Sequence, residues 1–193
     1  NTTSVGFGLR PVGKVGQNRD AQGLSEYSVA ASSTIIYFND AVEMASTGNI
    51  TVAAAGDVLL GSLNGSFYTD PTTSKPTFLN YVPNNAATDI VAFISDDPYE
   101  RFEIRSNNTG ASAQTDVGMN ADISYTAGSS ANYVSKVTLN TSQLAVSTGA
   151  QLRVIGVTKN ITSNELLNAT TYSTNVVVTA IINNHFYKQF TGI

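Results

Sequence analysis

The chain has 193 residues, only 12% of them are charged, and its formal net charge is −4. A negative chain with few cations disfavours nucleic-acid binding, because proteins that bind nucleic acids neutralise phosphates with Lys and Arg. The absence of Cys and the single His exclude disulfide frameworks, thiol chemistry, zinc ribbons and multi-histidine metal sites. Thr, Ser and Asn, with 23, 20 and 19 residues, replace the missing charge and indicate a neutral, polar β protein.

Residues 1–25 differ from the rest of the chain, because they are Gly-rich and show neither helical nor alternating periodicity. Three of the ten cationic residues fall in this segment, against the single acid Asp20. We expect an extended N-terminal arm that contacts a neighbouring subunit by strand addition, the alternative being a frayed terminus. The candidate neighbour-contacting residues of this arm are Phe7, Leu9, Arg10, Pro11, Lys14 and Arg19.

From residue 26 onward, alternating and β-branched runs separated by Gly, Asn and Asp predict strands. The first group is expected at residues 26–30, 34–38, 50–54, 58–63, 66–69 and 77–82. Asn64-Gly65 predicts a hairpin turn between two of these strands, since a type I′ turn needs positive φ at both central residues. Residues 70–76 contain two Pro and predict a rigid surface loop.

Residues 90–105 predict a hairpin with one solvent-exposed face. Residues 90–94 are a continuous apolar run, and the Asp-Asp-Pro-Tyr sequence at 96–99 is typical of a turn. Residues 100–105 then alternate, which places Phe102 and Ile104 on one face and three charged residues on the other.

The second half of the chain begins with a predicted long loop at 107–132, which contains one short element around 119–125. Strands are expected at 134–139, 152–158 and 176–182, with single helical turns at 141–145 and 163–168. Short strands at this spacing predict a mainly β fold: a β-sandwich or jelly roll, or a small β-barrel, formed as one domain over 26–193. The longest uncharged stretch, 166–187, carries many Asn and Thr, so we predict no membrane span.

Acidic residues cluster around the predicted turn at 96–103. Asp96, Asp97 and Glu100 supply oxygen ligands of the kind that Ca²⁺ accepts, but their spacing does not match an EF-hand loop. Arg101 and Arg105 are close enough in sequence to pair with them. Turn chemistry with a solvated charged face is therefore the favoured interpretation, and a cation site or a glycosidase carboxylate pair are the alternatives.

No catalytic set emerges from the remaining motifs. His185 could serve a Ser–His–Asp triad, but no G-x-S-x-G motif accompanies it, so a turn or interface histidine is favoured. The glycines around Lys14 do not form a phosphate loop, because Val15 follows the Lys and no strand-to-helix pattern surrounds it. We therefore predict no catalytic residues, no cofactor and no metal.

Several longer motifs resemble small structural proteins of tailed bacteriophages. They are GLRPVGKVGQN at 8–18, AAAGDVLLGSLNGSFYTDPTTSKPTFLNYVP at 53–83, DIVAFISDDPYERFEI at 89–104 and TDVGMNADI at 115–123. Together with the end of the chain, residues 176–193, they are spread from residue 8 to residue 193 and make up 85 of the 193 residues. The group that they resemble is the head decoration, or cement, proteins of marine and cyanobacterial phages.

This resemblance implies a virion protein on the outer surface of an icosahedral capsid, where it binds the major capsid protein and stabilises capsomer contacts. It also implies a homotrimer, no enzyme activity and no cofactor. Many copies that each grip two or three subunits add up by effective concentration, even if each contact is weak. Two other hypotheses remain: a β-rich tail, fibre or carbohydrate- and receptor-binding module, and a hydrolase that uses the carboxylates near 96–103.

Overall fold

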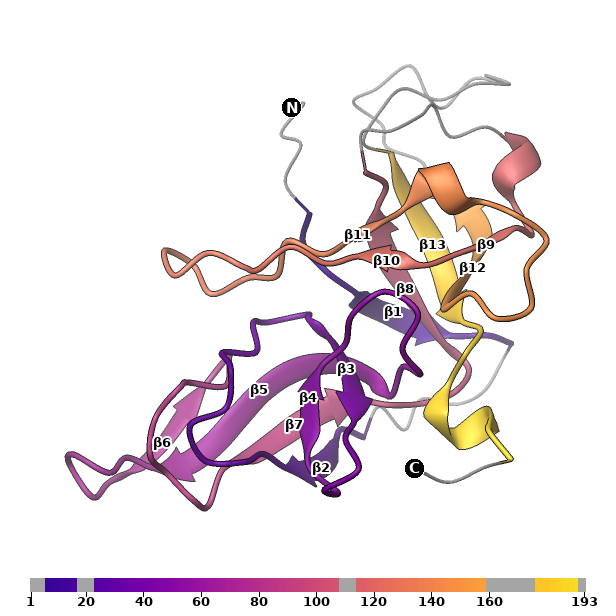
Figure 1. The fold of residues 1–193 in the computed structure, drawn as a ribbon. Helices are drawn as coiled ribbons and strands as arrows, with labels where there is room; N and C mark the ends of the chain where they lie inside the picture. Colours follow the sequence, from indigo (N-terminus) through magenta and orange to yellow (C-terminus); the bar gives the residue numbers. More distant parts are fainter. Residues whose placement is uncertain (1–5, 17–22, 108–113, 159–175, 191–193) are drawn as a thin grey trace.

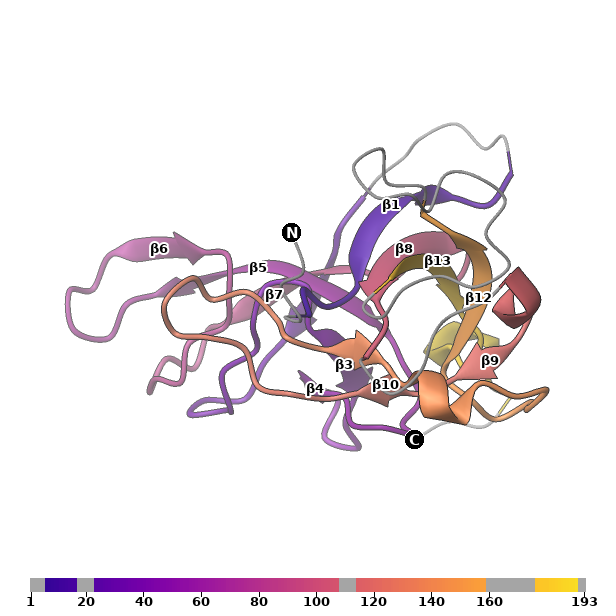
Figure 2. The ribbon, with the colours of Figure 1, turned by 90° about the horizontal axis from the view of Figure 1, so that it is seen from above.

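The computed structural model describes residues 6–16, 23–107, 114–158 and 176–190 (Figure 1). Two antiparallel sheets form most of this part of the chain, which confirms the predicted mainly β fold. They lie next to each other, and the β5–β6 end of one sheet extends away from the other (Figures 1 and 2).

The five-stranded sheet has the order β1-β8-β13-β12-β9. Its central strands β8 and β13 alternate, and the buried side chains of each point to one face. The bounds are β1 Arg10–Lys14, β8 Glu100–Arg105, β13 Val177–Ile182, β12 Leu152–Val157 and β9 Asn120–Ala121. The predicted alternation in β8 is confirmed, because Phe102 and Ile104 are fully buried.

The second sheet has the order β2-β7-β5-β3-β4, and β6 pairs with the far half of β5. Its bounds are β2 Ser25–Ser28, β7 Val91–Ser95, β5 Gly61–Thr69, β3 Ala41–Met44, β4 Ile50–Val52 and β6 Pro76–Leu79. The strand expected at 34–38 contributes only isolated bridges at Ile36 and Phe38. Strand β3 has no counterpart among the predictions.

Each sheet has its own hydrophobic cluster. The short pair β10 (Ile123–Ser124) and β11 (Thr138–Leu139) contributes Ile123 and Leu139 to the cluster of the five-stranded sheet. Ala41, Ala53 and Leu59 from the six-stranded side join the same cluster, so the two sheets share apolar contacts at their junction. The second cluster lies on the six-stranded sheet and includes Leu60, Leu63, Ile90 and Ile94.

Two hairpins predicted from local signals are wrong. Strands β7 and β8 do not pair: β7 lies in one sheet and β8 in the other, so the turn at 96–99 carries the chain between the sheets. The Asn64-Gly65 pair does not reverse the chain either, because it lies inside the continuous strand β5, at a register irregularity opposite β7. Gly is needed there for space, since a Cβ would lie 2.9 Å from the Leu79 carbonyl oxygen of β6.

The predicted loop at 107–132 is ordered by this chain itself over the residues described from 114 onward. It contains the 3₁₀ turn η1 (Gln114–Asp116), β9 and β10, which confirms the element expected around 119–125. Residues 125–137 then run along the six-stranded side, where the Tyr133 ring stacks 3.8 Å from the Tyr81 ring (Figure 1). A parallel bridge joins Val134 to Phe38.

Two further 3₁₀ turns lie within the described residues. The helical turn expected at 141–145 is η2 (Thr141–Gln143), whose N-cap is Asn140 rather than Thr141. The turn η4 (Phe186–Lys188) follows β13 and has His185 as its N-cap. The other predicted turn, 163–168, lies outside the described residues.

Candidate functional site

Residues 6–14, part of the predicted arm, lie within the folded body. Leu9 is fully buried in the cluster of the five-stranded sheet, and its N–H donates to the Asn39 carbonyl. Gly8 has φ +77°, and a Cβ there would lie 2.0 Å from the Asn39 carbonyl oxygen, so only Gly allows this close approach. Phe7 is half-buried, and the Arg10 guanidinium carbon lies 4.9 Å from the centre of its ring.

Strand β1 continues from this anchor and pairs with β8 at the edge of the five-stranded sheet. The register aligns Arg10 with Glu103 and Pro11 with Phe102, and it shifts between Pro11 and Gly13. The arm is therefore extended at 10–14, and these residues pair with the chain's own β8. Contact between these positions and a capsid or neighbouring subunit stays a prediction, and Arg19 lies outside the described residues.

The basic first strand and the acidic 96–103 segment form one structural feature. Within the described parts of the chain, both ion pairs join these two segments: Arg10 to Glu103, and Lys14 Nζ to Asp97 Oδ2 at 2.6 Å. The hydrogen bond from Lys14 lowers the pKa of the Asp97 carboxyl. The sequence suggested that the acids of this segment pair with Arg101 and Arg105. In the structure Asp97 and Glu103 form ion pairs with the cations of β1.

Glu100 fastens the same strand through its backbone. Its side chain is only 3% exposed, which corrects the expectation of a solvated acidic face, and its Oε1 accepts the Gly13 N–H at 3.0 Å. The Val15 N–H donates to the Tyr99 carbonyl at 2.9 Å. We call this set of contacts, between residues 10–15 and residues 97–103, the strand clasp.

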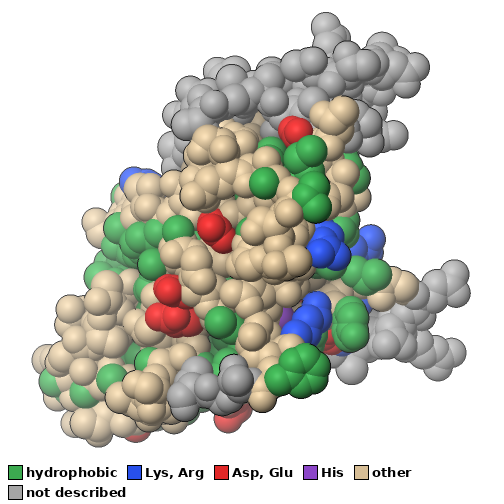
Figure 3. All heavy atoms as spheres, turned by 45° about the vertical axis from the view of Figure 1, so that its right-hand side comes forward, with side chains coloured by type: hydrophobic (Ala, Val, Ile, Leu, Met, Phe, Trp, Pro, Cys, Tyr) green, Lys and Arg blue, Asp and Glu red, His purple; other side chains and the backbone are tan. Residues whose placement is uncertain are grey.

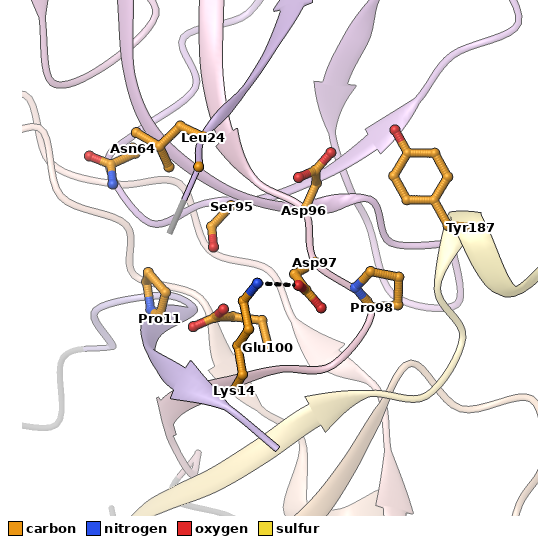
Figure 4. A pocket seen from close by; sticks show the side chains of 11 residues that line it. Pro11, Lys14, Leu24, Asn64, Ser95, Asp96, Asp97, Pro98, Glu100 and Tyr187 are labelled. Atoms are coloured by element: carbon orange, nitrogen blue, oxygen red, sulfur yellow. Dashed lines mark ion pairs between the residues drawn. The ribbon is translucent and has the colours of Figure 1, made fainter. Parts of the chain in front are cut away.

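A pocket of about 470 Å³ lies between the clasp and the start of the six-stranded sheet (Figure 4). Its carboxylates already have partners: Asp96 accepts hydrogen bonds from Ser25 and Tyr27, and Asp97 accepts one from the Tyr99 N–H. The described residues contain no group of three or more acidic or His side chains that could hold a metal. The pocket is lined by Pro11, Lys14, Gly23, Leu24, Asn64, Ser95, Asp96, Asp97, Pro98, Glu100 and Tyr187.

Hydrogen bonds connect this pocket to the C-terminal turn η4. The Tyr27 hydroxyl donates to Asp96, and it also contacts the Tyr187 hydroxyl. Burial and the bond to Asp96 raise the pKa of Tyr27, so the phenol remains protonated. This connection joins β2 and η4 beside the turn between the sheets.

His185 lies at the junction of the two sheets. It is fully buried, it forms a parallel bridge with Leu59, and its Nδ1 accepts the Tyr187 N–H at 3.1 Å. Burial, with a smaller contribution from Lys188, lowers its pKa to about 4. As the N-cap of η4 it fits the first of the two roles expected from the sequence, a turn or an interface histidine.

An exposed aromatic strip runs across the outer face of the six-stranded sheet and was missed by the sequence reasoning. Phe67 on β5 and Phe78 on β6 are direct cross-strand partners, 43% and 63% exposed. The Phe78 ring lies 6.0 Å from that of Phe93 on β7. Ala92 and Ile94, the sequence neighbours of Phe93, face the core. We call Phe67, Phe78 and Phe93 the aromatic strip. Alternation around Phe67 was a usable signal, but the unbroken apolar run at 90–94 concealed the exposed side of β7.

Charges are sparse on the molecular surface. Figure 3 shows one face on which neutral polar side chains and backbone predominate and charged groups are scattered. Over the described residues, no helix has the length and apolar character needed to cross a bilayer.

Comparisons with protein-family models, with curated proteins and with solved structures find no match to this chain. Functional conclusions therefore rest on its own residues and on the phage resemblance of its motifs, which stays a prediction.

Proposed function

We propose that this chain is a structural virion protein that decorates the outer surface of an icosahedral phage head. It binds the major capsid protein, stabilises contacts between capsomers, self-associates as a homotrimer, and has neither catalytic activity nor a cofactor. The phage-like motifs motivate this proposal, and they are spread along the chain from residue 8 to residue 193.

The aromatic strip is the observation that carries the proposal. Two Phe side chains that are 43% and 63% exposed lie side by side on a regular sheet face. Aromatic residues are enriched in protein interfaces, where they bury a large area at low cost in side-chain entropy. One edge of the strip carries a charge, because the exposed Glu26 on β2 is the register partner of Phe93, so we expect the covering surface to give this carboxylate a partner or to leave it in solvent. The strip is our candidate for the surface that meets the shell.

The first test replaces Phe67 and Phe78 with Ser and measures occupancy on purified heads that lack the protein. We expect the affinity to fall by roughly a hundredfold, because truncating two interface aromatics costs about 1–2 kcal/mol each. Val146→Ser is the matched control, since Val146 is 97% exposed and lies outside the strip. Wild-type occupancy of the double variant would contradict the assignment of this surface.

A tail, fibre or receptor-binding module is the second candidate, because aromatic rings on a sheet face also suit stacking against the apolar faces of sugars. The same variants separate the two functions. Binding to a glycan array that is lost in Phe67→Ser/Phe78→Ser, together with localisation on tails, would favour this candidate over head decoration.

A further inference from the structure

The strand clasp is held together by contacts that another copy of the chain could supply equally well. Ion pairs join its two sides at Arg10–Glu103 and Lys14–Asp97, and the Gly13 N–H donates to buried Glu100. Among the described residues β1 is an edge strand, and β8 is the strand with which it pairs. The clasp therefore brings together a basic strand and an acidic receiving segment that are complementary in charge and register.

The contact between the strand and the receiving segment borders a cavity. Pro11, Lys14, Asp97 and Glu100 all line the 470 Å³ pocket, in which Lys14 reaches Asp97 (Figure 4). Polar contacts around a cavity fasten β1 beyond Leu9, where a closed apolar core is lacking. Such segments open at a lower free energy than the core strands of a domain.

The connection to the next strand allows these contacts to form between copies. Ten residues separate the end of β1 at Lys14 from the start of β2 at Ser25, and these two strands belong to different sheets. A linker of ten residues can span up to about 33 Å when extended. Exchange of a terminal element between identical chains reproduces every native contact, so it forms an oligomer at low energetic cost.

We propose that copies of this protein associate by exchanging residues 6–15, so that β1 of one copy pairs with β8 of the next. Leu9 supplies the apolar anchor, and Arg10 and Lys14 set the register against Glu103 and Asp97 of the receiving copy. This inference rests on the self-association in the proposed function and is independent of any contact with the capsid.

Charge reversal provides the test, because it separates pairing within a chain from pairing between chains. Lys14→Glu has an acid at both position 14 and position 97, and Asp97→Lys has a cation at both positions. Neither variant can form the Lys14–Asp97 pair internally. When the two are mixed, the strand of each variant matches the receiving segment of the other.

One variant is isotope-labelled, and the mixture is measured by native mass spectrometry. We expect mixed oligomers at roughly two- to fivefold above the random proportion, which is the effect that restoring an exposed ion pair can have. The excess should shrink in high salt. The control is Lys14→Glu/Asp97→Lys in a single chain, which restores the pair in every arrangement and should mix with its own labelled copy at random.

Two results would overturn the inference, and they have different consequences for the proposed function. Oligomers that mix at random would show that copies associate without exchanging β1, so self-association would stand. Monomers at every concentration would remove both the exchange and the proposed homotrimer.

A second pair of variants covers the case in which charge reversal prevents folding. The chain contains no Cys, so Arg10→Cys and Glu103→Cys place single thiols at paired register positions on separate chains. Disulfide-linked heterodimers at more than about ten times the yield of a Val146→Cys and Glu103→Cys mixture would support exchange, because a disulfide needs neighbouring Cβ atoms. Equal yields would contradict it.

Discussion

At the scale of single residues, the N-terminal segment depends on a glycine that tolerates no side chain. Gly8 and Gly48 have nearly the same backbone conformation, with φ +77° and +78°. A Cβ on Gly8 would collide with the Asn39 carbonyl, whereas a Cβ on Gly48 would meet nothing within 4 Å. The two positions therefore separate backbone strain from steric overlap.

We predict that Gly48→Ala lowers the free energy of unfolding by about 1 kcal/mol, which is the cost of left-handed backbone for a residue with a Cβ. Gly8→Ala should cost at least about 3 kcal/mol, because the clash adds an overpacking penalty. Urea unfolding of both variants measures the difference. Equal losses would show that residues 6–9 do not pack as described.

His185 predicts a pH dependence of stability. Its pKa is lowered to about 4, from 6.5, by burial, so between these values the unfolded chain binds a proton that the folded chain excludes. Stability is therefore lost as the pH falls from 6.5 to 4. His185→Asn should remove about 3 kcal/mol of this loss, while its side-chain oxygen can still accept the Tyr187 N–H. Urea unfolding at pH 7 and pH 4 tests this, and an unchanged pH slope would contradict it.

Asp40 predicts the opposite sign over almost the same range. Its carboxyl is fully buried, Oδ2 accepts the Tyr37 N–H at 2.8 Å, and burial raises its pKa to about 6, from 3.8. The folded chain therefore takes up a proton first, and stability is gained as the pH falls from 6 to 3.8. Relative to wild type, Asp40→Asn should be about 3 kcal/mol more favourable at pH 7 than at pH 4. Urea unfolding at pH 7 and pH 4 checks this prediction. It would be contradicted if Asp40→Asn, like His185→Asn, gained stability relative to wild type at pH 4 rather than at pH 7.

At the scale of elements, the strand clasp should respond to the loss of its buried acceptor. Glu100→Ala leaves the half-buried Gly13 N–H without that acceptor, which costs about 1 kcal/mol, the lower end of the range for buried donors. We predict faster amide hydrogen exchange at residues 10–15 in this variant, with β12 and β13 unaffected. Glu100→Gln keeps a side-chain oxygen and is the matched control. Equal exchange rates in both variants would show that the Glu100 side chain does not fasten β1.

The elements also show which parts of the fold the sequence could predict. The side-chain alternation of β8 was predictable, because a period of two fixes which residues share a face. Its pairing partner was not, because alternation carries no information about the neighbouring strand, and β8 pairs with β13 and β1 rather than with β7. The Asn64-Gly65 signal failed for a similar reason: Gly serves the close approach of β6 there and not a turn.

The candidate site was predictable only in its parts. Composition located the cations of the first segment and the acids at 96–103, but their pairing across about ninety positions of sequence depends on tertiary structure. The aromatic strip combines residues from three strands, so its continuity likewise depends on the strand order.

At the scale of the whole molecule, the low charge content has a structural counterpart. The two ion pairs of the described chain join the N-terminal strand to the body, and the face drawn in Figure 3 is mostly neutral and polar. A surface of this kind can be covered by other copies and by a shell at a small electrostatic cost. The aromatic strip then provides the apolar contact, and the strand clasp provides the link between copies.

The most direct measurement is a cryo-EM map of the virions that carry this protein. We predict density for the β domain on the outside of the head, at three-fold or quasi-three-fold positions, with Phe67 and Phe78 facing the capsid protein. Density on the tail, or heads without this domain, would contradict the proposal that it is a capsid decoration protein.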